Sequence, residues 1–209
     1  YAPTGGEILA HPPQGKSRRI DGLKPDRITA LGMARTFQNI RLFPAMTVLE
    51  NVMLGRHCRT GAGILGAVLR SPGVAAEERE TVRTSYGLLE KVGLAGAADE
   101  FAGSLPYGAQ RRLEIARALA TEPFLLLLDE PAAGMNPQET RELDELIVRI
   151  RDREGVAILL IEHDMRLVMN ISDRICVMEY GKAIAAGTPR EIKNDPRVIE
   201  AYLGEDAHA

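Results

Sequence analysis

Two aliphatic runs that end in acidic residues constrain the fold of this chain more than any other feature. The first run, residues 124–128, ends at Asp129 and Glu130, and the second, residues 157–161, ends at Glu162. Each has the length of a β-strand and lacks the alternation that marks a strand with one face in water. We therefore expect two strands of an at least partly parallel sheet, covered on both faces. Ligands of such sheets bind at the carboxyl ends of the strands, where these acidic residues lie.

Helix signals separate the strands, which is the pattern of an α/β domain. A third short run, residues 34–37, ends at Gln38. Residues 47–50 (Thr-Val-Leu-Glu) form a capping box, and Asn136 followed by proline starts a helix that Gly155 closes. We expect one domain over residues 1–209 with a helical subdomain inserted at about residues 45–120.

The inserted region has its own pattern. Residues 76–92 alternate charged and apolar side chains with helical spacing, and Gly93 follows as a C′ residue. The Gly/Ala-rich residues 60–73 predict a flexible or partly helical connection within the subdomain.

Composition excludes several classes of protein. With 26 basic and 29 acidic residues the net charge is −3, so the basic surface that nucleic-acid binding requires is not expected. The longest aliphatic stretch, residues 156–161, is far shorter than the roughly 20 residues of a membrane span. No secretory signal opens the chain, and its 2 cysteines suggest no disulfide framework. We expect a cytoplasmic protein.

Residues 124–131 have the form of a Walker B strand. Such a strand delivers an Asp, here Asp129, to a nucleotide-bound Mg²⁺. The adjacent Glu130 can orient or deprotonate a water molecule, a task that needs a second carboxylate. Taken alone, the same letters also fit an ordinary acidic junction between a strand and a loop.

A glycine-containing loop precedes this strand. Residues 105–110 (Leu-Pro-Tyr-Gly-Ala-Gln) open a helix that continues through residues 111–119. Backbone N–H groups at a helix N-terminus can hold an anion. The alternative is a plain turn, and the position of the loop just before the acidic strand favours the anion site.

The order of these motifs resembles the ATP-binding subunit of ATP-binding cassette (ABC) transporters, over nearly the whole chain. The elements are Gln38, the loop at 105–110, the strand ending in Asp129-Glu130, and residues 162–164 (Glu-His-Asp). Four stretches more narrowly resemble the subgroup that serves branched-chain amino acid uptake: residues 34–43, 111–119, 131–137 and 161–165. The resemblance implies a P-loop NTPase-like α/β core with a mixed sheet, a helical subdomain, and ATP and Mg²⁺ as ligands.

The resemblance also implies roles for individual residues. Gln38 matches the Q-loop glutamine, which contacts Mg²⁺ or water and links the site to the membrane partner. Asp129 matches the Mg²⁺-associated acid and Glu130 the catalytic glutamate. His163 matches the switch histidine that contacts the γ-phosphate, although a lone histidine is more often an ordinary core or surface residue.

Two loops complete the implied nucleotide site. Residues 105–109 match the signature loop and residues 132–136 the D-loop. The nucleotide-binding residues implied with Gln38 are Leu105, Gly108, Ala109, Gly134 and Asn136. The chain departs from the family at Pro106, Tyr107 and Ala109, where Ser, Gly and Gln are usual. The serine hydroxyl is therefore absent, and Gly108 and the helix N-terminus are the groups expected to face the anion.

The P-loop of the family, with its Lys and Ser/Thr, and the N-terminal strands around it would lie before Tyr1. Residues 10–17 satisfy a loose P-loop pattern that ends in Lys16 and Ser17. Pro12 and Pro13 remove backbone N–H groups from this stretch, and no apolar helix follows it. We expect a hairpin-like excursion there instead of a phosphate loop.

The function that the resemblance implies is to energise an amino-acid importer, with a branched-chain or other nonpolar substrate. The implied partners are transmembrane permease subunits, contacted by residues 39–44, a second ATPase subunit, and indirectly a solute-binding protein. The implied location is the inner face of the cell membrane. One alternative is a non-catalytic module that docks on these partners without hydrolysing ATP. Another is a soluble cassette ATPase of translation or DNA repair, which the acidic balance and single cassette disfavour.

Overall fold

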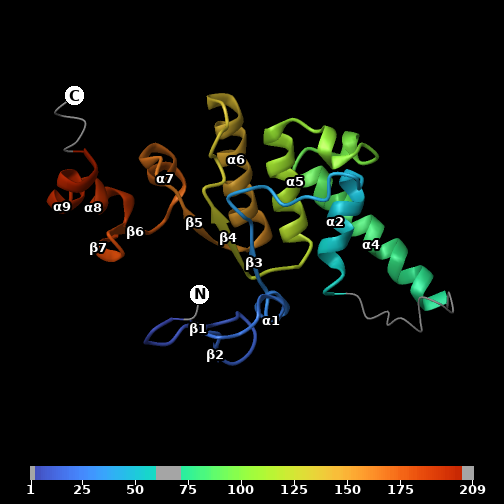
Figure 1. Cartoon of the computed structure of the whole chain (residues 1–209), viewed down its shortest axis with the longest axis horizontal. Coiled ribbons are helices and arrows are strands. Elements are labelled where there is room, and N and C mark those ends of the chain that lie inside the picture. The colour runs from blue at the N-terminus through green and yellow to red at the C-terminus, as the bar shows by residue number, and fades with distance from the viewer. Residues whose placement is uncertain (1–2, 60–71, 204–209) are drawn as a thin grey trace. The chain divides into compact units, whose positions relative to one another are not determined.

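The computed structural model describes residues 3–59 and 72–203, so most of the Gly/Ala-rich connection predicted at 60–73 lies outside the described residues. The chain divides into two compact units, Tyr1–Ile161 and Glu162–Ala209 (Figure 1). No helix in the described part of the chain is long and apolar enough to cross a membrane.

A three-stranded parallel sheet organises the first unit. Its strands are β3 (Met33–Arg35), β4 (Leu125–Asp129) and β5 (Ala157–Ile161), in the order β3-β4-β5. Arg35 pairs with Leu127 and Asp129 pairs with Ile161, so the carboxyl ends of β4 and β5 are level. The predicted parallel sheet is confirmed, and the polar residues after its strands come to one edge.

The prediction that both long strands are covered on two faces is wrong for β5. Leu159 is 52% exposed and Ile161 is 55% exposed. On β4, Leu126 and Leu128 of one face are buried, whereas Leu125 and Leu127 of the other face are partly buried. β5 is the outer strand of the order, paired with β4 alone among the described strands. An aliphatic run predicts that a segment is a strand, but it does not report how many layers cover that strand.

Helices precede and connect the strands of this unit. They are α1 (Pro25–Ala30), α2 (Val48–Arg56), α4 (Pro72–Lys91), α5 (Tyr107–Leu119) and α6 (Pro137–Glu154), with short 3₁₀ turns η1 (Ala95–Ala97) and η2 (Ala102–Ser104). The Thr47–Glu50 capping box is confirmed, and Asn136 caps α6, which ends at Gly155 in the left-handed conformation. The predicted helix at 76–92 is confirmed within α4. Between β3 and β4 the helix α2 packs against both α4 and α5.

The N-terminal segment contains a small hairpin. β1 (Leu9–Ala10) pairs antiparallel with β2 (Arg18–Arg19). His11 Nδ1 lies 2.7 Å from Ser17 Oγ inside the connecting loop. Lys16 and Ser17 therefore lead directly into a strand and not into a helix, as the sequence predicted for this excursion.

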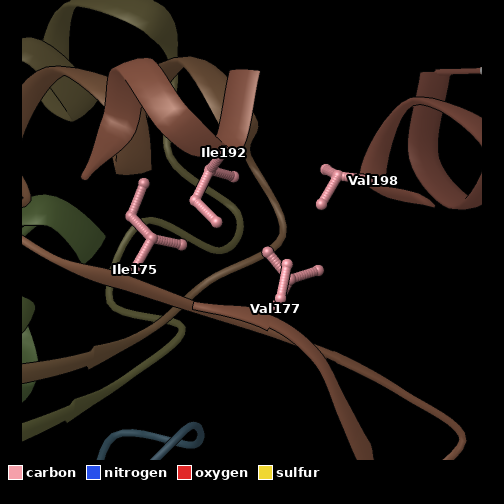
Figure 2. Close-up of a cluster of buried hydrophobic side chains, with 5 residues drawn as sticks. Ile175, Val177, Ile192 and Val198 are labelled. Carbon is pink, nitrogen blue, oxygen red and sulfur yellow. The ribbon is translucent and has the colours of Figure 1, made fainter. Parts of the chain in front are cut away.

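The second unit has its own small core. Its elements are α7 (Met165–Ile171), β6 (Ile175–Glu179), β7 (Lys182–Gly187), α8 (Pro189–Lys193), α9 (Pro196–Val198) and a π-helical turn η3 (Ile199–Leu203). β6 and β7 form an antiparallel hairpin. Figure 2 shows Ile175 and Val177 of β6 beside Ile192 of α8 and Val198 of α9, which are all buried. Met165, Val168 and Met169 of α7 pack against this cluster.

Candidate nucleotide site

Gln38 and Glu130 meet at the carboxyl edge of the parallel sheet. The Gln38 amide Nε2 donates a hydrogen bond of 2.8 Å to Glu130 Oε2. The two residues follow β3 and β4, which are neighbours in the sheet although they are far apart in the sequence. The prediction that strand-end polar residues gather here is confirmed for this pair.

Asp129 ends β4 beside the same pair. Its Oδ2 accepts a hydrogen bond of 2.7 Å from Arg35 Nη2, at the end of β3. The Asp129 side chain is 20% exposed, and that of Arg35 is 58% exposed. Arg35 is a site residue that the sequence analysis missed. The signal that could have found it is a charged residue at the last position of an otherwise apolar strand.

The backbone of Glu130 is held in an unusual conformation. Its φ of 44° lies in the left-handed region, where a non-glycine residue costs on the order of 1–3 kcal/mol. Two hydrogen bonds fix it: Glu130 N donates to Ile161 O (2.9 Å), and Glu130 O accepts from Ala133 N (3.2 Å). Such strain persists only where the surroundings over-determine it, so β5 and the following turn fix the backbone of Glu130 and the point from which its side chain leaves the main chain.

The side chains at this edge offer oxygen ligands of the kind that Mg²⁺ prefers, in the small number that a Mg²⁺ site commonly takes from protein. Asp129 and Gln38 offer a carboxylate and an amide oxygen, which are ligands for a hard cation. The described residues contain no group of three or more His, Cys, Asp or Glu side chains placed to hold a metal ion. Mg²⁺ commonly takes one or two protein oxygens and completes its shell with water and substrate phosphates.

The predicted signature loop opens α5. Pro106 is the N-cap residue, Leu105 and Ala109 are buried, and Gln110 Nε2 donates to Leu105 O (2.9 Å). A Cβ added at Gly108 would lie 2.8 Å from Oε1 of Glu139. A side chain at position 108 would therefore displace the Glu139 carboxylate, whose Oε2 accepts from Asn136 N (3.0 Å) at the start of α6. The anion-facing role of Gly108 stays a prediction.

The predicted D-loop lies against the signature loop. A Cβ added at Gly134, whose φ is +78°, would lie 3.7 Å from the Tyr107 ring. The Asn136 side chain accepts from the backbone N–H groups of Gln138 and Glu139, which caps α6. The structure thus explains Asn136 by helix capping, and its contact with a nucleotide stays a prediction.

His163 belongs to the second unit, at the start of the chain segment that leads into α7. Its side chain is 75% exposed, and its backbone N donates to Glu162 Oε2 (3.2 Å). Asp164 caps α7 by accepting from Arg166 N and Leu167 N. The Glu-His-Asp sequence therefore presents an exposed imidazole just before a capped helix, and its role toward phosphate stays a prediction.

Comparison with known families gives two matches along the chain. Residues 1–133 match the family described as ABC transporter. Residues 184–208 match the family described as branched-chain amino acid ATP-binding cassette transporter.

Curated relatives are similar over almost the full length of the chain. The high-affinity branched-chain amino acid transport ATP-binding protein LivG of Salmonella typhimurium is 48% identical over 205 residues, which cover 98% of this chain and 78% of that protein. BraF of Pseudomonas aeruginosa, with the same description, is 46% identical over the same shares.

Solved structures give the same picture. A nucleotide-free ATP-binding cassette from an ABC transporter superposes with a TM-score of 0.71 at 33% identity, covering 88% of this chain and 74% of that chain. The ADP conformation of an ATP-binding cassette gives a TM-score of 0.73 at 32% identity, covering 90% and 74%.

Proposed function

This chain belongs to the ABC transporter family of ATP-binding proteins, and on that premise we propose that it binds and hydrolyses ATP to energise an importer of branched-chain or other nonpolar amino acids. Its fold is the α/β fold of the ATP-binding cassettes. The observation that carries the catalytic part of the proposal is the 2.8 Å hydrogen bond between Gln38 and Glu130. It links the residue that resembles the Q-loop glutamine to the residue that resembles the catalytic glutamate.

In the proposed mechanism, Glu130 orients the attacking water and accepts its proton as general base. The fixed backbone of Glu130 and the Gln38 amide hold the Oε atoms at the sheet edge, which limits the geometries that the water can adopt. Asp129 and Gln38 would hold Mg²⁺, which neutralises phosphate charge when it is bound. His163 contacts the γ-phosphate.

The nucleotide is proposed to lie between this chain and a second ATPase subunit, either a copy or a relative. The N-terminus of α5, with Leu105, Gly108 and Ala109, faces the nucleotide of that partner through backbone N–H groups. Gly134 and Asn136 contribute from the neighbouring loop. Support for this arrangement comes from the packing of the two loops against each other, at Tyr107 with Gly134.

The proposed membrane partners are transmembrane permease subunits, which receive substrate from a solute-binding protein. Residues 39–44 supply the contact, and Phe43 within them is 53% exposed. Asn51 fixes this segment by accepting from Phe43 N (3.0 Å) and donating to Phe43 O (3.1 Å). A peripheral position on the inner face of the cell membrane follows from such partners.

The test is Glu130→Gln in the complete ATP-binding subunit, assembled with its permease. Loss of the general base should lower the ATP turnover number by about 10²–10⁴-fold while ATP stays bound. Glu122→Gln is a matched control, because Glu122 also has positive φ (50°) and pairs with Arg56 away from the sheet edge. Unchanged turnover in Glu130→Gln would remove Glu130 from the base role. Permease binding by a wild-type subunit that never hydrolyses ATP would support the non-catalytic module instead.

A further inference from the structure

A buried ion pair lies on α5 next to the candidate site. The Arg111 side chain is 0% exposed, that of Glu114 is 2% exposed, and Arg111 Nη1 lies 2.8 Å from Glu114 Oε2. Taking two charges out of water is costly, and a buried pair often adds little to stability over apolar residues of similar size. The groups that the pair contacts therefore indicate what it does.

Both ends of the pair reach the chain around Gln38. Arg111 Nη1 donates to Phe37 O (2.6 Å), and Arg111 Nη2 donates to Gln38 O (2.7 Å). Glu114 Oε1 accepts from Arg41 N (3.3 Å). The planar guanidinium can bind two successive carbonyl oxygens at once, which a lysine ammonium cannot match in geometry. The pair thus holds the backbone at Gln38 and on both sides of it.

The same guanidinium also reaches the signature loop. Arg111 Nη2 donates to the Tyr107 hydroxyl (3.3 Å), and the Tyr107 ring lies against Gly134. Tyr107 stands where the resemblance to the family leads one to expect glycine, so this link depends on a side chain that the usual family pattern lacks. One side chain therefore connects the segment at Gln38, the start of α5 and the loop at Gly134.

We propose that Arg111, paired with Glu114, is a positioning residue that fixes the backbone at Phe37 and Gln38 so that the Gln38 amide stays on Glu130. Tyr107 extends this brace to the loop at Gly134. The inference rests on the proposed ATPase function for its kinetic consequence. The geometric part, a backbone held by the pair, concerns this chain alone.

The experiment separates positioning from stability with two variants. Arg111→Met leaves the Glu114 carboxylate buried without its partner, so a lower melting temperature is expected. The double variant Arg111→Met with Glu114→Gln removes both charges and should recover most of that loss. Arg112→Met is the matched control, because Arg112 is the next residue on α5 and lies 3.7 Å from Glu142, away from Gln38.

Two readouts are measured on each variant of the complete subunit. Hydrogen exchange at the backbone amides of residues 38–43 should accelerate in Arg111→Met and in the double variant. It should stay unchanged in Arg112→Met. The kcat for ATP should fall by about 10–100-fold in the double variant with little change in KM, because misplacing a catalytic group slows chemistry more than binding. Arg111→Lys should have a kcat between that of Arg111→Met and that of the wild type, because lysine keeps the positive charge but lacks the planar guanidinium that binds two carbonyl oxygens at once.

The proposal is overturned if the double variant regains its melting temperature together with wild-type kcat, because Arg111 would then act on stability alone. Unchanged exchange at residues 38–43 would overturn it as well. A wild-type subunit without ATPase activity would contradict the proposed function instead, and the exchange comparison would still decide whether the brace exists.

Discussion

Replacing Gly55 with alanine tests how closely α2 packs against α5, the helix that begins at the predicted signature loop and contains Arg111. A Cβ at Gly55 would lie 2.3 Å from the backbone oxygen of Arg117 and 2.9 Å from the Cβ of Ala120. Both contacts come from α5 or its C-cap, and the nearer one is to backbone, which cannot rotate away. The two helices must therefore separate to accept one methyl group.

The expected cost follows from two opposing effects. Alanine at a helical position gains at most about 1 kcal/mol over glycine in helix propensity. The methyl group must move by about 1 Å to reach an ordinary van der Waals distance, and such overpacking costs about 1–3 kcal/mol, occasionally more. Because the 2.3 Å contact is to a backbone atom, we expect the upper part of that range and a net loss of about 1–2 kcal/mol in the free energy of unfolding.

Gly87→Ala is the control for this prediction. Gly87 also lies in a helix, α4, but a Cβ there would meet nothing within 4 Å. The same substitution should therefore raise the free energy of unfolding, by about 0.5–1 kcal/mol. Urea denaturation followed by circular dichroism measures both variants. If Gly55→Ala were as stable as Gly87→Ala, the close α2–α5 packing would be refuted.

Two further predictions concern charged side chains. Arg35→Gln removes the side chain that pairs with Asp129, so the ATP-bound subunit should bind Mg²⁺ more tightly. The expected gain in affinity, measured by calorimetry, is about two- to fivefold, as for an exposed ion pair. Unchanged affinity would show that Arg35 does not compete with the cation. The side-chain hydrogen bond from Arg19, with that from Ile8 N, lowers the pKa of Asp21 to about 2 from 3.8. Stability from this carboxylate is present above the unfolded value and is lost as the pH falls through about 2. Carboxyl NMR titration should give that midpoint, and Arg19→Gln should move it back toward 3.8; a wild-type midpoint near 3.8 would contradict the contact.

Local signals in the sequence predicted the parts of the structure that depend on neighbours in the chain. The caps at Thr47 and Asn136 are satisfied by the residues three positions later, so a short pattern contains all the partners. The meeting of Gln38 with Glu130 was predictable for a different reason: parallel strands end at the same edge, so residues after them converge.

The features that escaped prediction depend on long-range packing. Arg111 and Glu114 are three residues apart on a helix, a spacing that usually marks a solvated surface pair. They are buried because the segment after β3 lies on them, about 73 residues earlier in the chain. The exposed face of β5 is the opposite case, since the sequence is apolar and the described chain leaves Leu159 and Ile161 in solvent.

These long-range contacts bear on how the candidate base is held. Glu130 is constrained from three directions: Ile161 O accepts from its N–H, Ala133 N donates to its carbonyl oxygen, and Gln38 donates to its carboxylate. The first two constraints act on the backbone and are independent of α5. The third acts on the reacting group and depends on Gln38, whose own carbonyl is held by Arg111. Of the three constraints, the contact at the carboxylate is therefore the one that depends on α5, so we expect loss of the Arg111 contacts to loosen it while the backbone hydrogen bonds at Ile161 and Ala133 remain.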